Sequence, residues 1–172
     1  MRLLVLLLLL TGCAAGLPAP GPTALGPPPL GPTDAAYVQL AIPQVESALP
    51  LLDLVTARDG TLAPLAREIT ASHRAELDRL HALLRDRGLT YLDEHRGHDM
   101  PGMVTAPEVA GLGTLTGPEF DTTAEALLKA HLDESVTVAR VARESGTDTD
   151  LRALVADLVR HREDHLGKLS VP

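Results

Sequence analysis

Residues 62–88 read LAPLAREITASHRAELDRLHALLRDRG, and this stretch decides the fold class. Its apolar residues recur at the three- and four-residue spacing of an amphipathic helix, and one stripe holds Ile69, His73, Leu77, Leu80 and Leu84. Gly88 takes the place of the glycine that commonly follows the last turn of a helix. The sequence therefore predicts a helix over residues 62–87.

Three other segments show the same periodicity, and no strand-like alternation competes with it. One spans residues 34–58 and carries Pro43 and Pro50, which should kink or divide it. Another begins at Pro118 or Asp121 and reaches about Ser145, and the last runs from about residue 148 to residue 169. The chain is thus predicted to be all-α.

An internal repeat relates the four segments in pairs. The joints Asp59-Gly60-Thr61 and Ser145-Gly146-Thr147 look alike, and the residues before them share a spacing, matching Asp34, Tyr37, Gln44, Ala48 and Leu49 with Asp121, Ala124, His131, Ser135 and Val136. We therefore expect two copies of a helical hairpin, joined by a long central connection over residues 89–117. Connections of that length are uncommon and are often functional.

The first residues are typical of an export signal. Arg2 precedes an apolar run over residues 3–10 that is too short to span a bilayer permanently. The run ends in Leu-Thr-Gly-Cys, which resembles the bacterial lipoprotein signal, and Cys13 is the only cysteine of the chain. We expect residues 1–12 to be a signal peptide and Cys13 to carry a lipid that anchors the protein to the outer face of a membrane. The alternative is a free thiol at Cys13.

A proline-rich tether separates this anchor from the helices. Residues 17–32 hold seven of the fourteen prolines, a composition that favours extended polyproline structure. The domain boundaries are therefore predicted as signal peptide 1–12, lipidated cysteine and tether 13–33, and helical bundle 34–170. A formal net charge of −8 does not favour a nucleic acid partner.

Within the central connection, residues 98–103 read HDMPGM. The chain has three methionines, and Met100 and Met103 are the two beyond the initiator. Thioether sulfur and imidazole suit Cu(I) better than hard cations do, so His98, Met100 and Met103 are candidate ligands of a copper ion. The competing interpretation is that the methionines fill gaps against an apolar surface.

The predicted helices carry four more candidate metal ligands. His161 and His165 are four residues apart on one helical face, a spacing that can chelate a metal. His73 and His131 lie on or beside apolar faces, each followed three residues later by a glutamate, Glu76 or Glu134. This is the reverse of the Glu-x-x-His order of di-iron bundles, so that site is not supported. The alternative is that all four imidazoles are hydrogen-bonded or flanking residues of the core.

Hydrolase and nucleotide-binding motifs are absent from the sequence, and no nucleophile with a base is evident. We therefore expect a binding protein and not an enzyme.

The string from His98 to Thr105, followed by Glu108–Leu112 and Gly117–Asp121, resembles the centre of the bacterial domain-of-unknown-function family 305. The resemblance covers residues 34–169 and implies an exported, ferritin-like four-helix bundle that is associated in several members with copper. The family carries a Met-Pro-Gly-Met stretch in this loop and a paired-histidine motif on its first and third helices.

This chain departs from the family pattern on the helices. The first paired-histidine motif falls at residues 41–45 and is replaced by Gln44 and Val45, and the second keeps His131 but has Leu132. The leading hypothesis is therefore a lipid-anchored, extracytoplasmic bundle that binds copper through the loop cluster and one or more of His131, His161 and His165. The alternative function is a bundle that has lost metal binding and acts as an envelope interaction module, with a protein partner that the sequence does not identify.

Overall fold

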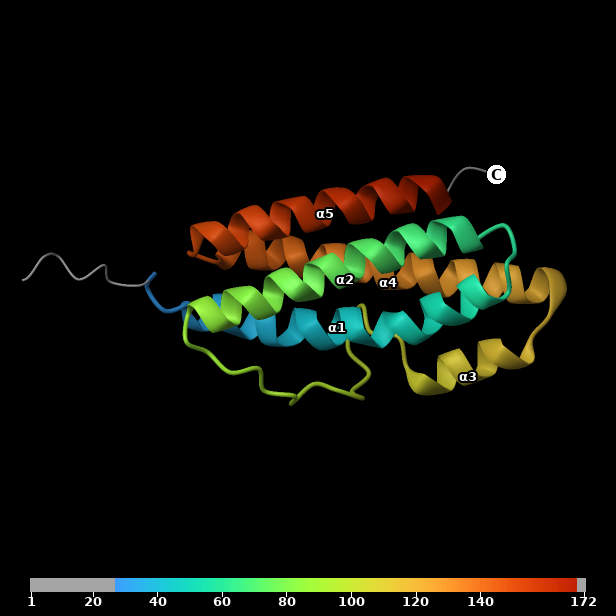
Figure 1. Cartoon of the computed structure of the whole chain (residues 1–172), viewed down its shortest axis with the longest axis horizontal. Coiled ribbons are helices and arrows are strands. Elements are labelled where there is room, and N and C mark those ends of the chain that lie inside the picture. Colours follow the sequence, from blue (N-terminus) through green and yellow to red (C-terminus); the bar gives the residue numbers. More distant parts are fainter. Residues whose placement is uncertain (1–26, 170–172) are drawn as a thin grey trace, which may run out of the picture.

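Five helices follow one another in the computed structural model, which describes residues 27–169. They are α1 (Pro32–Ala57), α2 (Ala63–Asp86), α3 (Ala106–Thr114), α4 (Gly117–Ser145) and α5 (Thr149–Leu169) (Figure 1). No strand occurs in the described range. The predicted all-α class is confirmed.

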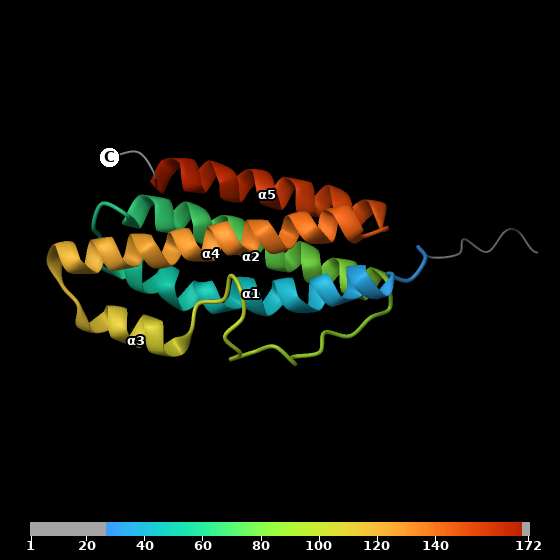
Figure 2. The ribbon, with the colours of Figure 1, turned by 180° about the vertical axis from the view of Figure 1, so that it is seen from behind.

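The four long helices form two hairpins that pack together. α1 pairs with α2 and α4 pairs with α5, while α1 also contacts α4 and α2 contacts α5 (Figures 1 and 2). The prediction of a four-helix bundle built from two hairpins is confirmed. Residues 1–26, which include the expected signal peptide and Cys13, lie outside the described residues.

Prolines and capping residues explain where several helices begin. α1, α2, α3 and α4 each have a proline at the first or second helical position, where its missing N–H costs nothing. α5 begins after Asp148, whose side chain accepts a hydrogen bond from Leu151 N at 2.9 Å, as an N-cap residue does.

The structure differs from the sequence-based prediction at two places. α1 is one helix of 26 residues that continues through Pro43 and Pro50, so of the two expected outcomes, a kink or a division, the division does not occur. The two prolines are seven residues apart and therefore share one helical face, which borders a pocket between α1, the central connection and α3. The second difference is α3 itself, which occupies nine residues of the expected loop and begins with a capping box between Thr105 and Glu108.

The core consists of two apolar halves with a polar layer between them. One half includes Val38, Ile42, Leu84 and Val155, and the other includes Leu52, Ile69 and Leu128. Each long helix contributes buried polar residues to the layer between them: Gln44 from α1, His73 and Glu76 from α2, His131 and Ser135 from α4, and Arg162 and His165 from α5. α1 is the one helix in the described range that is long and apolar enough to span a membrane, but half of its apolar window is buried in the bundle.

The predicted repeat has a structural counterpart at the two ends of the bundle. Asp34, at the start of α1, accepts hydrogen bonds from Thr147 N and Asp148 N in the joint between α4 and α5. Its repeat partner Asp121, at the start of α4, lies beside Gly60 in the joint between α1 and α2. Each hairpin thus begins against the turn of the other.

Candidate functional site

A tight turn lies at the centre of HDMPGM. Met103 N donates to Met100 O at 2.9 Å, and Gly102 has a φ of +78°. Proline at the second position, glycine with positive φ at the third, and this hydrogen bond are the features of a type II turn. Because the ends of such a turn are less than about 7 Å apart, Met100 and Met103 are held as neighbours.

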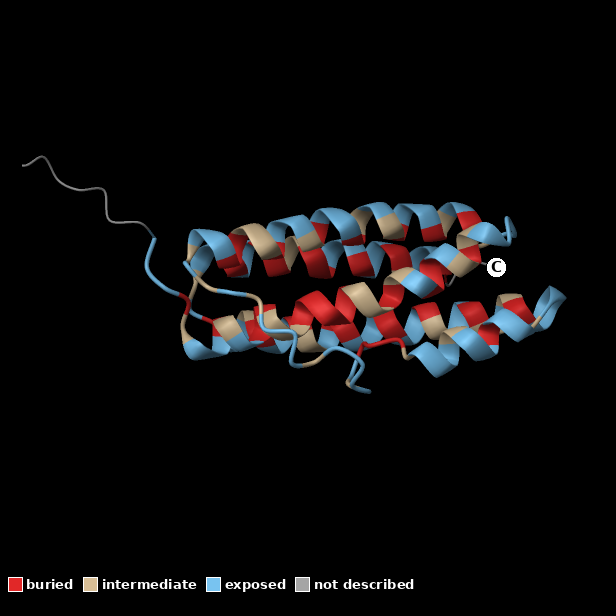
Figure 3. Cartoon of the chain, turned by 60° about the horizontal axis from the view of Figure 1, so that its bottom comes forward, coloured by how far each residue is buried: buried red, intermediate tan, exposed pale blue. Residues whose placement is uncertain are grey.

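Side chains from both hairpins hold this turn. Gln44 Nε2 of α1 donates to Pro101 O at 2.6 Å, and Gly102 N donates to Glu134 Oε2 of α4 at 2.6 Å. His131 Nδ1 lies 2.6 Å from Gly102 O. The turn is buried where it enters the bundle, as the red stretch of the loop beside α1 shows (Figure 3).

Glycine is the only residue type that fits at position 102. A Cβ built there would lie 2.4 Å from Gln44 Nε2 and 3.0 Å from Ser135 N, in addition to the strain of a positive φ. The backbone of the turn therefore approaches α1 and α4 more closely than any side chain would allow.

His131 connects the turn to α2. Its Nε2 lies 2.8 Å from His73 Nε2, and the two rings meet edge to face with centroids 5.1 Å apart. Both imidazoles are buried, and both ring nitrogens of His131 are engaged. At 2.8 Å the two nitrogens are at hydrogen-bonding distance, which is shorter than the roughly 3.3 Å between two ligands that each lie about 2.0 Å from one tetrahedral ion.

Burial keeps these imidazoles neutral. It lowers the pKa of His131 to about 4, with the charge of Arg162 acting in the same direction. Burial also lowers the pKa of His73 well below its ordinary value, and His131 and Arg162 add to the effect.

A pocket of about 340 Å³ adjoins the turn and gathers part of the predicted site. Met100, Met103 and His131 line it together with three carboxylates, from Asp99, Glu108 and Glu134. Met103 is buried and Met100 is half-buried.

The other predicted ligands lie elsewhere. His98 is exposed next to His95 and does not line the pocket. His161 is exposed and lines a small cavity between α2 and α5, and His165 is buried on the same helix with Nδ1 unpartnered. Across residues 27–169, no three side chains of His, Cys, Asp or Glu are arranged to hold a metal ion.

The glutamates three residues after His73 and His131 bond to other groups. Glu134 accepts from Gly102 N, and Glu76 forms a buried two-point ion pair with Arg162 at 2.9 and 3.2 Å. Burial raises the pKa of Glu76, although Arg162 opposes the shift. Gln44 and Arg162 were not among the predicted site residues. The signal for both was a polar residue at a core-facing position of an apolar helix.

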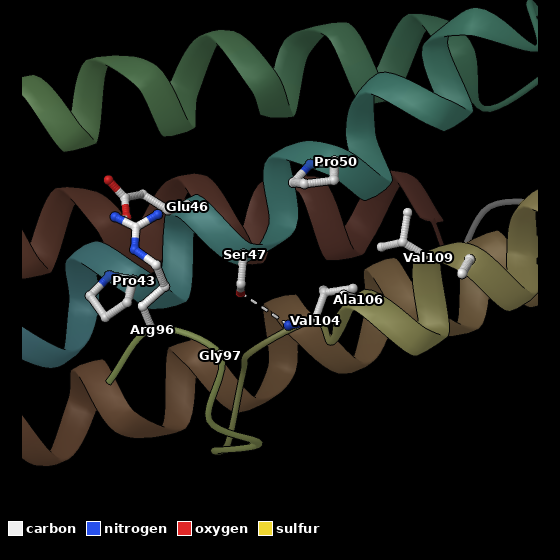
Figure 4. A pocket seen from close by; sticks show the side chains of 10 residues that line it. Pro43, Glu46, Ser47, Pro50, Arg96, Gly97, Val104, Ala106 and Val109 are labelled. Atoms are coloured by element: carbon white, nitrogen blue, oxygen red, sulfur yellow. Dashed lines mark hydrogen bonds and ion pairs between the residues drawn. The ribbon is translucent and has the colours of Figure 1, made fainter. Parts of the chain in front are cut away.

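On the other side of the loop, a cavity of about 460 Å³ lies between α1 and α3 (Figure 4). Its lining is mostly apolar and includes Pro43, Pro50 and Val109. Ser47 also lines it, and its Oγ accepts a hydrogen bond from Val104 N at 3.0 Å. The Arg96–Glu46 ion pair lies at one end. The Ser47–Val104 hydrogen bond and the Arg96–Glu46 ion pair together hold the loop against α1.

Comparison with known proteins now places the chain. The model of the family "Domain of unknown function (DUF305)" matches residues 34–170. The chain belongs to this family. No curated protein matches the sequence.

Three solved structures share the fold. A DUF305 fragment from Deinococcus radiodurans is 22% identical with a TM-score of 0.73, over 83% of this chain and 95% of that one. A "putative secreted protein DUF305" from Streptomyces coelicolor is 22% identical with a TM-score of 0.69, over 80% and 90%. A conserved hypothetical protein from Mycobacterium tuberculosis is 17% identical with a TM-score of 0.60, over 81% and 96%.

Gln44 and His131 relate the structure of the turn to the family resemblance. The resemblance aligned them with the two paired-histidine motifs of the family, and the structure places them on either side of the same turn. In this chain, both positions hold the loop in place through hydrogen bonds to its backbone.

Proposed function

We propose that this DUF305 protein binds a soft monovalent metal ion, copper(I), through the sulfur atoms of Met100 and Met103. The observation that carries the proposal is that both methionines and three carboxylates line one and the same pocket. Thioethers prefer Cu(I), and the carboxylates raise the local concentration of cations. His131 lines the pocket, but its part is to hold the turn, because both its nitrogens are engaged.

The proposed location is the outer face of a cell membrane, with an acyl anchor on Cys13 and the proline-rich segment as a spacer. The lipoprotein-like Leu-Thr-Gly-Cys motif supports the anchor. A structural relative described as secreted supports export. The protein would then bind or hand on copper outside the cytoplasm, without catalysing a reaction.

The test is a titration of residues 13–172 carrying Cys13→Ser, which removes the competing thiol, with Cu(I) against a chromogenic chelator. We expect Met100→Leu/Met103→Leu to weaken binding by at least about tenfold, or ~1.4 kcal/mol. The matched control is His161→Gln, outside the pocket, which should bind like the parent. Equal binding by the double variant would refute the methionine site. No binding by the parent would favour the interaction module instead.

A further inference from the structure

A chain of buried hydrogen bonds runs from α2 through α4 to the loop. His73 Nε2 lies 2.8 Å from His131 Nε2, and His131 Nδ1 lies 2.6 Å from Gly102 O. His73 and His131 are 1% and 2% exposed, so solvent does not compete for these contacts. The only hydrogen bond of His73 within the described residues goes to His131.

The acceptor at the end of the chain fixes the first proton. A carbonyl oxygen can only accept, so the short contact to Gly102 O requires a proton on His131 Nδ1. A neutral imidazole carries one proton, which leaves His131 Nε2 with a lone pair.

The contact between the rings then fixes the second proton. Two N–H groups cannot face each other at 2.8 Å, and two lone pairs would not attract, so one proton lies between the two Nε2 atoms. Since His131 Nε2 carries no proton, His73 Nε2 must be the donor. His73 Nδ1 is therefore unprotonated as well, and it has no hydrogen-bond partner in the described structure. An unpaired acceptor is a smaller anomaly than a stranded buried N–H would be.

The reverse arrangement, with the proton between the rings coming from His131, requires an imidazolium if the bond to Gly102 is kept. Arg162 lies close enough to disfavour such a charge, and burial disfavours it further. The two histidines therefore hold opposite tautomers, Nδ1–H on His131 and Nε2–H on His73.

We infer that His73 is a positioning residue for the Met100–Met103 turn: by donating to His131 Nε2 it holds the His131 ring in the one tautomer that can donate to Gly102 O. Gln44 and Glu134 hold neighbouring backbone atoms of the turn, but among the hydrogen bonds of residues 27–169 only those of His131 link the turn to α2. On this inference, His73 has a positioning role in place of the metal-ligand role that the sequence suggested. The effect on ion binding rests on the proposed function, whereas the tautomers and the loop contact do not.

The first experiment uses the parent protein of residues 13–172 with Cys13→Ser, labelled with ¹⁵N, in metal-free buffer near neutral pH. Long-range proton–nitrogen correlation spectra of the imidazoles should show His131 as the Nδ1–H tautomer and His73 as the Nε2–H tautomer. Any other pair of tautomers overturns the inference, and this measurement needs no variant that must fold.

The second experiment compares His73→Leu, which has no donor, with His73→Gln, whose Nε2 can donate at a similar reach. Hydrogen exchange of the Gly102 amide should accelerate at least about tenfold in His73→Leu and return to within about threefold of the parent in His73→Gln. His161→Leu, an exposed histidine on α5, is the matched control and should leave this amide unchanged. Unchanged exchange in His73→Leu would overturn the positioning role.

Titration with Ag(I), an air-stable probe of soft ligands, separates this inference from the proposed function. Weaker Ag(I) binding by His73→Leu but not by His73→Gln supports both. If the parent does not bind Ag(I) while tautomers and exchange follow expectation, the proposed function fails and the positioning role stands. If Met100→Leu/Met103→Leu loses Ag(I) while His73→Leu leaves binding and exchange unchanged, the positioning role fails alone.

Discussion

At the scale of single residues, three separate structural constraints act on Gly102. Its backbone needs a positive φ, its hydrogen atoms face Gln44 and Ser135 where a Cβ would collide, and its peptide groups bond to Glu134 and His131. The position of both methionines depends on this residue, although it contributes no side chain to the pocket.

Replacing Gly102 with alanine should cost about 2 to 4 kcal/mol of stability, because strain at positive φ adds to a collision with Gln44. Gly97→Ala is the matched control, since Gly97 has the same φ of +78° but nothing within 4 Å of the added Cβ. It should lose only about 1 to 2 kcal/mol. Urea unfolding measures both changes, and equal losses would show that the close approach to α1 does not matter.

The buried histidines should make the metal-free protein sensitive to acid. The unfolded chain binds a proton at His131 near the ordinary pKa of 6.5, whereas the folded protein does so only near 4. Stability should therefore fall as pH falls from about 6.5 towards 4, by up to about 1.4 kcal/mol per pH unit for this group. His73 and His165, whose pKa values burial also lowers, act in the same direction.

Glu76 opposes this trend, because its raised pKa lets the folded protein hold a proton that the unfolded chain has released. Urea midpoints measured from about pH 7 to about pH 5 test the sign of the sum. Because three imidazoles act against this one carboxyl, stability should fall towards acid, and a profile that rises towards acid would contradict the assignment of neutral buried imidazoles.

At the scale of elements, the joints between paired helices matter most. Asp34 is 2% exposed and bonds to the backbone of Thr147 and Asp148, so it ties the start of α1 to the start of α5. Gly146 makes room for it, since a Cβ there would lie 2.2 Å from Asp34 Oδ1. The start of the first hairpin is thereby bonded to the turn of the second hairpin.

Asp34→Ala should cost about 1 to 3 kcal/mol, because it leaves the N–H groups of Thr147 and Asp148 and the hydroxyl of Thr147 without their acceptor. Asp121→Ala is the matched control, as Asp121 occupies the repeat position beside Gly60 but is less buried. It should cost less than about 1 kcal/mol. Thermal unfolding compares the two, and a similar loss in both would mean that the hydrogen bonds of Asp34 contribute little.

Much of this level was predictable from periodicity and from the two similar joints, which located four helices and their pairing. α3 was missed although Thr105-x-x-Glu108 is a readable capping box, because glycine-rich residues 111–113 weaken helical propensity. The contact of His73 with His131 was not predictable. It joins residues 58 apart and depends on how the hairpins rotate against each other, which a spacing rule does not describe.

At the scale of the whole molecule, a buried ion pair spans the hairpins. Glu76 of α2 and Arg162 of α5 are 7% and 2% exposed, and Arg162 retains unpartnered Nε and Nη1 atoms in the described structure. A buried pair of this kind costs desolvation free energy that its attraction barely returns. The layer between the apolar halves therefore fixes how the hairpins are aligned more than it stabilises them.

Glu76→Leu alone should destabilise the protein by about 3 to 5 kcal/mol, because it leaves the Arg162 charge buried and unpaired. Glu76→Leu/Arg162→Met should recover most of that loss, since both partners are then apolar. Urea unfolding of the single and double variants gives the coupling. Additive losses in the double variant would show that the two side chains do not act as a pair.

The position of the methionine turn along the bundle sets the direction from which a partner can reach it. α1 starts at one end of the bundle and α5 finishes at the opposite one (Figure 1). Gln44, which grips the methionine turn, is 12 residues beyond Pro32, or about 18 Å along a helix. A partner that reaches the pocket beside this turn must therefore approach the bundle from its side and not from either end.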